Sequence, residues 1–372
     1  MSTPQPFKLH IPEDAIADLR ARLERTRWPD EPPGEAWATG ASVAYLKDLV
    51  DYWRTGFDWR AWEAKLNAFA QYTVPIDGIN LHYLHVASKR KDAMPLLLSH
   101  GWPGSVFEFH KLIPRLTEDF TVVAPSLPGY TLSFQPGQKR FGVEAISETF
   151  AGLMSALGYE RFGAQGGDWG GTISSVLGHR HAARMIGIHL NFLAVRRDIP
   201  AGTAASAEEQ AYFADLAAFL KEETGYQWIQ GTRPQTLAFG LTDSPAGLAA
   251  WIVEKFRAWT DCGGDVESAV SRDEMLANLS LYWFTGAIAS SFWPYYARSH
   301  GPWPIPEGGA VKVPTGYVQF PKEIIRPPRS LASRTYTDIR RWTVEPKGGH
   351  FAALEQPEVL AREIKAFFAS LA

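Results

Sequence analysis

The segment that most restricts how this chain can fold is Gly-Gly-Asp-Trp-Gly-Gly at residues 166–171. It lies between a predicted strand over residues 161–165 and a helical pattern that begins near Thr172. A sharp turn from strand to helix needs small neighbours, so that its central side chain can stand exposed above the sheet. The central residue is Asp168, which is either a nucleophile or the cap of the following helix. The turn alone does not decide between the two.

Apolar runs typical of buried strands recur along the chain. They cover residues 95–99 and 120–124, and a helical pattern follows over residues 143–157. Upstream, residues 79–86 follow an Asp-Gly turn and alternate in polarity, as expected of a hairpin strand. Short buried strands that alternate with helices predict an α/β protein with a mostly parallel, doubly wound sheet.

The change of pattern along the chain predicts four segments. Residues 1–70 form an N-terminal helical arm, and residues 71–195 form the first part of the α/β core. Strand character then stops, and the Ala-, Trp- and Phe-rich residues 196–304 are interpreted as an inserted helical cap. Residues 305–372 return to strands and a closing helix, and complete the core.

Composition limits the kinds of partner. The 372 residues carry 37 basic and 40 acidic side chains without a long run of one sign, so we expect no nucleic-acid partner. The one cysteine, Cys262, rules out an internal disulfide and a cysteine-based metal cluster. No apolar stretch approaches the roughly 18 residues of a membrane span, and no signal peptide is evident. We therefore expect a cytoplasmic protein without a membrane anchor.

An aspartate nucleophile restricts the chemistry. Its attack on a carboxylic ester would give a mixed anhydride, whereas attack on an epoxide or alkyl halide gives an ordinary ester that water can cleave. A second motif, His-Gly-Trp-Pro-Gly-Ser at residues 100–105, follows the strand that ends at Ser99. Together with residues 166–170 it resembles the epoxide hydrolases of the α/β-hydrolase superfamily, most closely the microsomal type with its N-terminal arm. The resemblance covers nearly the whole chain.

The resemblance implies an α/β-hydrolase fold and the conversion of an epoxide and water to a vicinal diol. The reaction would pass through a covalent ester on Asp168 and would need neither a metal nor an organic cofactor. The 14 Trp, 13 Tyr and 21 Phe residues suit an apolar or aromatic epoxide, although core packing accounts for most of them. Detoxification is the role that such an activity suggests.

The general base and its orienting acid are expected late in the chain. His350 lies in a loop between the last strand and the last helix, so the chain order of nucleophile, acid and histidine fits this fold. Asp338, Glu345 and Glu323 all precede it, and the resembled family places the acid at Glu323. Asp198 is the alternative, because a related dehalogenase family uses that region.

Backbone and phenol donors complete the predicted site. Trp102 and Trp169 would supply the N–H groups of an oxyanion hole. The resembled family uses two cap tyrosines to stabilise the opening epoxide, and these correspond to Tyr226 and Tyr295. Tyr296 is an alternative to its neighbour, because the match at that point is uncertain by one residue.

Two other functions compete with this interpretation. A haloalkane or haloacetate dehalogenase uses the same nucleophile but stabilises a halide, usually with indole N–H groups. A ligand-binding protein on an inactive hydrolase fold is the alternative from another class. The sequence does not identify the epoxide, and the arm either wraps its own core or supports a homodimer.

Overall fold

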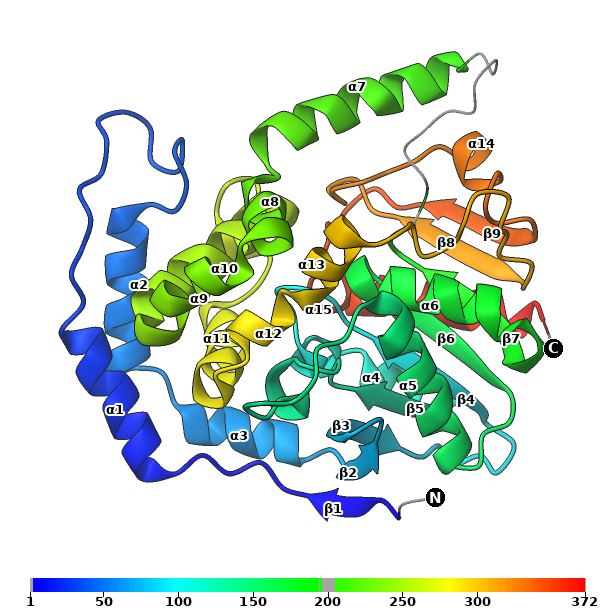
Figure 1. Cartoon of the computed structure of the whole chain (residues 1–372), viewed down its shortest axis with the longest axis horizontal. Coiled ribbons are helices and arrows are strands. Elements are labelled where there is room, and N and C mark those ends of the chain that lie inside the picture. Colours follow the sequence, from blue (N-terminus) through cyan, green and yellow to red (C-terminus); the bar gives the residue numbers. More distant parts are fainter. Residues whose placement is uncertain (1–2, 194, 196–204, 372) are drawn as a thin grey trace.

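One mixed sheet forms the centre of the molecule. The computed structural model describes residues 3–193, 195 and 205–371, and in these residues nine strands pair in the order β1-β2-β3-β5-β4-β6-β7-β8-β9 (Figure 1). The pairs from β1 to β5 are antiparallel, and those from β5 to β9 are parallel. The prediction of a mostly parallel sheet is therefore confirmed. The strands are β1 (Gln5–Phe7), β2 (Gln71–Ile76), β3 (Ile79–Val86), β4 (Met94–Ser99), β5 (Phe120–Pro125), β6 (Phe162–Gly166), β7 (Met185–Leu190), β8 (Thr315–Gln319) and β9 (Ile339–Val344).

The antiparallel end of the sheet holds one expected and one unexpected feature. Asp77 and Gly78 both have positive φ angles, of 49° and 80°, as the tight turn of the predicted hairpin between β2 and β3 requires. Strand β1 was not predicted, since residues 1–70 were assigned to the helical arm. Three residues at a sheet edge are too few to show the alternation that identifies a strand.

Helices cover both faces of the sheet because neighbouring strand residues point in opposite directions. On β4, Leu97 belongs to the same apolar cluster as Ile173 of α6, whereas Leu96 and Leu98 belong to the cluster of Phe367 of α16. All five side chains are fully buried. The helices of the core are α4 (Ile113–Leu116), α5 (Val143–Ala156), α6 (Asp168–Arg180), α14 (Arg329–Ala332), α15 (Ala352–Glu355) and α16 (Pro357–Ala369).

In the described part of the chain, seven further α-helices, here called the inserted helices, lie between β7 and β8. Two of them begin with capping boxes, in which Ser206 pairs with Glu209 and Ser271 with Glu274. One ends at Gly286, whose φ of 66° suits a helix terminus. The inserted helices are α7 (Ala207–Glu222), α8 (Gly225–Thr232), α9 (Pro234–Asp243), α10 (Pro245–Trp259), α11 (Arg272–Thr285), α12 (Ile288–Ser291) and α13 (Trp293–His300).

The N-terminal arm contributes α1 (Glu13–Glu24), α2 (Val43–Thr55) and α3 (Trp59–Asn67), and it packs mainly on the inserted helices. Helices α1 and α2 contact α10, and α3 contacts α11, at one side of the molecule (Figure 1). The Trp53 indole N–H donates to Ser280 Oγ at 3.1 Å, which ties α2 to α11.

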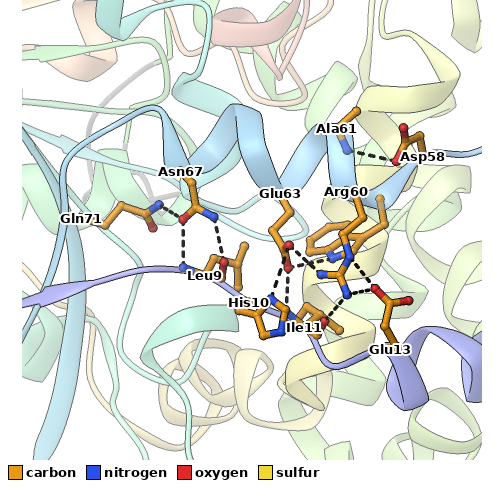
Figure 2. A network of polar contacts seen from close by, with 11 residues as sticks. Leu9, His10, Ile11, Glu13, Asp58, Arg60, Ala61, Glu63, Asn67 and Gln71 are labelled. Atoms are coloured by element: carbon orange, nitrogen blue, oxygen red, sulfur yellow. Dashed lines mark hydrogen bonds and ion pairs between the residues drawn. The ribbon is translucent and has the colours of Figure 1, made fainter.

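Polar side chains of α3, of which Glu63 is buried, hold the extended segment that precedes α1 (Figure 2). One carboxylate oxygen of Glu63 accepts a hydrogen bond from the Ile11 amide at 2.6 Å, and the other pairs with Arg60 at 2.6 Å. The Asn67 side chain bonds both the amide and the carbonyl of Leu9.

Within the described part of the chain, no helix is both long enough and apolar enough to cross a membrane.

Candidate active site

Asp168 occupies a strained turn between β6 and α6. Its φ of 49° is unusual for a residue with a side chain, and such strain is concentrated at functional sites. The glycines allow the turn because a Cβ at Gly166 would overlap the Gly170 backbone, and one at Gly170 would overlap the Ser99 carbonyl. Helix α6 begins at Asp168 itself, so the expected start near Thr172 was wrong. Glycine-rich helix starts lack the apolar spacing on which that prediction relied.

The loop after β4 reaches the carboxylate of Asp168 from one side. The Trp102 amide donates to Asp168 Oδ1 at 2.8 Å. Helix α11 holds this loop in place, because the Asn278 side chain donates to the Pro103 carbonyl at 2.8 Å and the Tyr282 hydroxyl donates to the Gly104 carbonyl at 2.7 Å. Sequence analysis missed both α11 residues, since nothing in a helical pattern shows which distant loop a polar side chain contacts.

His350 lies between two carboxylates. Its Nε2 is 3.4 Å from Asp168 Oδ2, and its Nδ1 is 2.6 Å from Glu323 Oε1. Burial disfavours the imidazolium, but the charge of Glu323 and the contacts with Asp168 outweigh that effect and raise the pKa of His350 well above its usual range. A histidine held in this way is oriented by Glu323 and directed at Asp168.

The other candidate acids lie elsewhere. Asp338 pairs with Arg340, and Glu345 pairs with Arg362. Asp198 lies outside the described residues. Of the candidates that the structure describes, Glu323 is the one that contacts His350.

The His350 loop is anchored to the end of α10. The Gly348 amide donates to Asp261 Oδ2 at 2.9 Å, and the His350 amide donates to the Trp259 carbonyl at 2.8 Å. Glu355, which follows His350 in the chain, accepts a hydrogen bond from the Asp261 amide at 2.8 Å and adds a third contact between the two segments. Sequence analysis did not find this link, because its partners are far apart in the chain and each contact is donated by a main-chain amide, which no residue type marks.

Tyr226 of α8 and Tyr295 of α13 lie together above the turn. Their ring centroids are 5.6 Å apart, and both rings pack on Trp102, Tyr226 in a stacked arrangement at 5.2 Å and Tyr295 edge-on at 5.8 Å. The Tyr226 hydroxyl accepts a hydrogen bond from the Gln227 side chain at 2.8 Å. Burial, followed by the nearby Tyr226 and Asp168, raises the pKa of Tyr295 well above its usual range. Tyr295 is therefore a neutral hydrogen-bond donor at ordinary pH.

Tyr296 points to another environment. It is partly exposed and stacks on Trp293 at 4.7 Å and on His300 at 4.1 Å. It does not line the cavity that Tyr226 and Tyr295 line. The geometry therefore distinguishes the two adjacent tyrosines, which the sequence left open.

A cavity of about 620 Å³ lies above Asp168, between the sheet and the inserted helices. Trp169, the residue after the turn, lines it, and its ring packs edge-on against Tyr295 at 4.8 Å. The Trp169 amide belongs to the first turn of α6, where N–H groups have no acceptor within the helix. Most of the other lining side chains are apolar or aromatic, among them Phe192, Leu193, Val195, Leu220, Trp228, Trp303, Ile324 and Ile325.

This arrangement suits covalent catalysis. A carboxylate stands at the floor of an apolar cavity, with a histidine–carboxylate pair beside it and two phenols opposite. Across the described residues, no group of three or more His, Cys, Asp or Glu side chains is placed to hold a metal ion.

Comparison with known proteins gives consistent matches. The family described as "Epoxide hydrolase N terminus" matches residues 4–109, and the "alpha/beta hydrolase fold" family matches residues 94–192. A Stigmatella aurantiaca relative is 46% identical over 98% of this chain and 85% of its own. Epoxide hydrolase 1 of Sus scrofa is 35% identical over 99% of this chain and 89% of its own. The crystal structure of juvenile hormone epoxide hydrolase from the silkworm Bombyx mori superposes with a TM-score of 0.90 at 30% identity, covering 100% of this chain and 95% of that one.

These matches first define a class, the hydrolases of the α/β-hydrolase fold. Within that class, the chain belongs to the epoxide hydrolase family, and it resembles the microsomal type over nearly its whole length. It is an enzyme that hydrolyses epoxides, and none of these relatives favours the dehalogenase alternative.

Proposed function

We propose that Asp168 is the nucleophile of this epoxide hydrolase and that the diol forms through an ester on its side chain. One observation carries the proposal. The Asp168 carboxylate borders the large cavity on one side and is 3.4 Å from His350 Nε2 on the other. A nucleophile and a base in contact, with the base oriented by a third group, are what covalent hydrolysis requires.

In the first half of the reaction, a carboxylate oxygen of Asp168 attacks an epoxide carbon. The C–O bond of the ring breaks as the ester bond forms, and negative charge develops on the epoxide oxygen. The hydroxyls of Tyr226 and Tyr295 stabilise this charge by donating hydrogen bonds. Neutral phenols do so without placing a positive charge next to the substrate before the reaction.

Ester formation prepares His350 for the second half. The ester has no negative charge, so the contribution of Asp168 to the raised pKa of His350 disappears, and the imidazole can accept a proton. His350 then takes a proton from water, whose oxygen attacks Cγ of Asp168. The Trp102 and Trp169 amides stabilise the tetrahedral oxyanion. The Cγ–O bond to the product breaks, and the leaving oxygen takes the proton that His350 returns. The second proton of the water is released when Asp168 becomes a carboxylate again, and it replaces the proton that the epoxide oxygen takes from a phenol, so the diol leaves and the enzyme is restored.

The lining of the large cavity supports an apolar or aromatic epoxide as the substrate class. We propose that the inserted helices act as the cap that shapes this cavity, with the segment boundaries 1–70, 71–195, 196–304 and 305–372 given above. A cytoplasmic location, a homodimer and a role in detoxification also stay proposals, and light scattering of the purified protein tests the second.

The mechanism is tested by the path of the water oxygen. In a single turnover in water labelled with heavy oxygen, with enzyme in excess over styrene oxide, the label should enter the peptide that contains Asp168. The diol of this first turnover should be unlabelled, because its new oxygen comes from the original carboxylate. Label in the first-turnover diol would mean direct attack of water on the epoxide and would overturn the proposal.

A further inference from the structure

A second, much smaller cavity also borders Asp168, and among the described residues Asp168 is the one lining residue that it shares with the large cavity. Its volume is about 20 Å³, which is enough for one water molecule. Asp168 and His350 line it, together with Glu108, Gln165 and Asn191. The cavity therefore touches both the proposed nucleophile and the proposed base.

Gln165 lacks a hydrogen bond that a water in this cavity would provide. Its side-chain N–H group donates to Asn191 Oδ1 at 2.8 Å. Its Oε1, in contrast, is buried and has no partner within the described chain, and the residue is only 1% exposed. Buried polar atoms are seldom left unsatisfied, and a water needs two or more polar partners. Gln165 Oε1 is one such partner.

Glu108 supplies a second polar group. It lies in the short 3-10 helix Val106–Phe109, which Ser105 caps. A Cβ at position 104 would overlap Glu108 Oε2, so an alanine there would displace the Glu108 carboxyl. In the described part of the structure, the Glu108 carboxyl has no hydrogen bond to another residue, and desolvation raises its pKa to about 8. Near neutral pH it is therefore protonated and adds no second negative charge beside Asp168.

We infer that Glu108 and Gln165 hold the hydrolytic water against His350 and Asp168, which makes Glu108 a positioning residue for the second half of the reaction. The inference rests on the proposed ester at Asp168. One hydrogen of the water is taken by His350 Nε2, and the other is donated to a carboxyl oxygen of Glu108 or to Gln165 Oε1. The water oxygen is then left with its lone pair directed at Cγ of Asp168.

The role predicted for Glu108 affects one step only. Attack on the epoxide takes place in the large cavity, which Glu108 does not line. Loss of the Glu108 carboxyl should therefore slow ester hydrolysis and leave ester formation nearly unchanged. Because the neutral carboxyl does the positioning, a glutamine should replace it.

The experiment follows the two steps separately in the full-length enzyme with styrene oxide, by rapid quench and mass of the intact protein. In E108A, hydrolysis of the ester should be about 10- to 100-fold slower, as expected for a lost hydrogen bond, and ester formation should stay within about threefold of the wild type. E108Q should stay within about threefold in both steps. G104A, which displaces the Glu108 carboxyl but leaves the residue in place, should behave as E108A does.

Three outcomes would overturn the inference. They are unchanged ester hydrolysis in E108A and G104A, an equal loss in both steps, or an E108Q variant as slow as E108A. H350Q is run in parallel, because it should accumulate the ester whether or not Glu108 holds the water. Absence of ester in H350Q would contradict the proposed function itself, so the two failures can be told apart.

Discussion

The two sides of the large cavity are built in different ways. On the sheet side, Asp168, His350 and Glu323 are joined by charged contacts of 2.6 and 3.4 Å. On the side of the inserted helices, Tyr226 and Tyr295 are placed mainly by ring packing on Trp102. The sheet side, here called the charged side, can move protons and carry a covalent bond. The side of the inserted helices, here called the aromatic side, offers neutral hydrogen-bond donors. The difference suggests that the aromatic side acts in ester formation, and that the charged side acts in both steps.

Removal of the proposed nucleophile should have the largest effect. In the D168A variant, diol formation should fall by at least about 10⁵-fold, since no ester can form. Product analysis by chromatography measures this loss. Because Asp168 is only partly buried, thermal unfolding should show a folded protein. Diol formation at more than a few percent of the wild-type rate would contradict a covalent mechanism.

Neutralising Glu323, the acid that orients His350, should slow ester hydrolysis far more than ester formation. In the E323Q variant, ester hydrolysis should be about 10³-fold slower, because His350 loses both its orientation and the charge that stabilises its protonated form. Ester formation should change by less than about tenfold. Rapid-quench measurement of both steps tests this, and an equal loss in both would show that the two sides are not separable.

Removal of one phenol hydroxyl should slow ester formation and leave ester hydrolysis nearly unchanged. Y295F and Y226F should each slow ester formation by about 10²-fold, the usual effect of losing one donor to a developing charge. Hydrolysis of the ester, once formed, should stay within about threefold. Stopped-flow fluorescence, which follows the tryptophans around the site, measures the first step. If these variants slowed only ester hydrolysis, the assignment of the aromatic side to ester formation would be wrong.

The pH dependence should also differ between the two steps. In the ester, His350 must be neutral to act as a base, so ester hydrolysis should rise about tenfold per pH unit until pH passes the pKa of His350 in that state. The direction follows from the loss of the Asp168 charge, which lowers this pKa relative to the free enzyme. Single-turnover decay of the ester over a pH series measures it. A rate that falls with rising pH would contradict a base role for His350.

The smallest effect should come from the tyrosine next to Tyr295. Y296F removes a hydroxyl that does not line the cavity, and its ring contacts with Trp293 and His300 are preserved by phenylalanine. Both steps should stay within about twofold of the wild type. A tenfold loss in ester formation would mean that the second donor had been assigned to the wrong tyrosine.

The residues of the charged side were easier to predict from sequence than the residues that hold them in place. Asp168 and His350 stand in local motifs whose glycines and chain positions are visible in the sequence. Glu323 could be selected only through the family resemblance, because three carboxylates precede His350 and only folding brings one of them to it. The supports from Asn278 and Tyr282, and the water-sized cavity at Glu108, depend on contacts between distant segments. Strand β1 was missed for a different reason, namely its length of three residues.

The mass of the intact H350Q variant is the most direct test of the ester on Asp168. After mixing with aryl, alkyl and terpenoid epoxides, and with matched haloalkanes, this variant should form the ester but not cleave it. The expected result is a mass gain equal to one whole epoxide, located on the peptide that contains Asp168. No adduct with any epoxide, or an adduct on another residue, would contradict it.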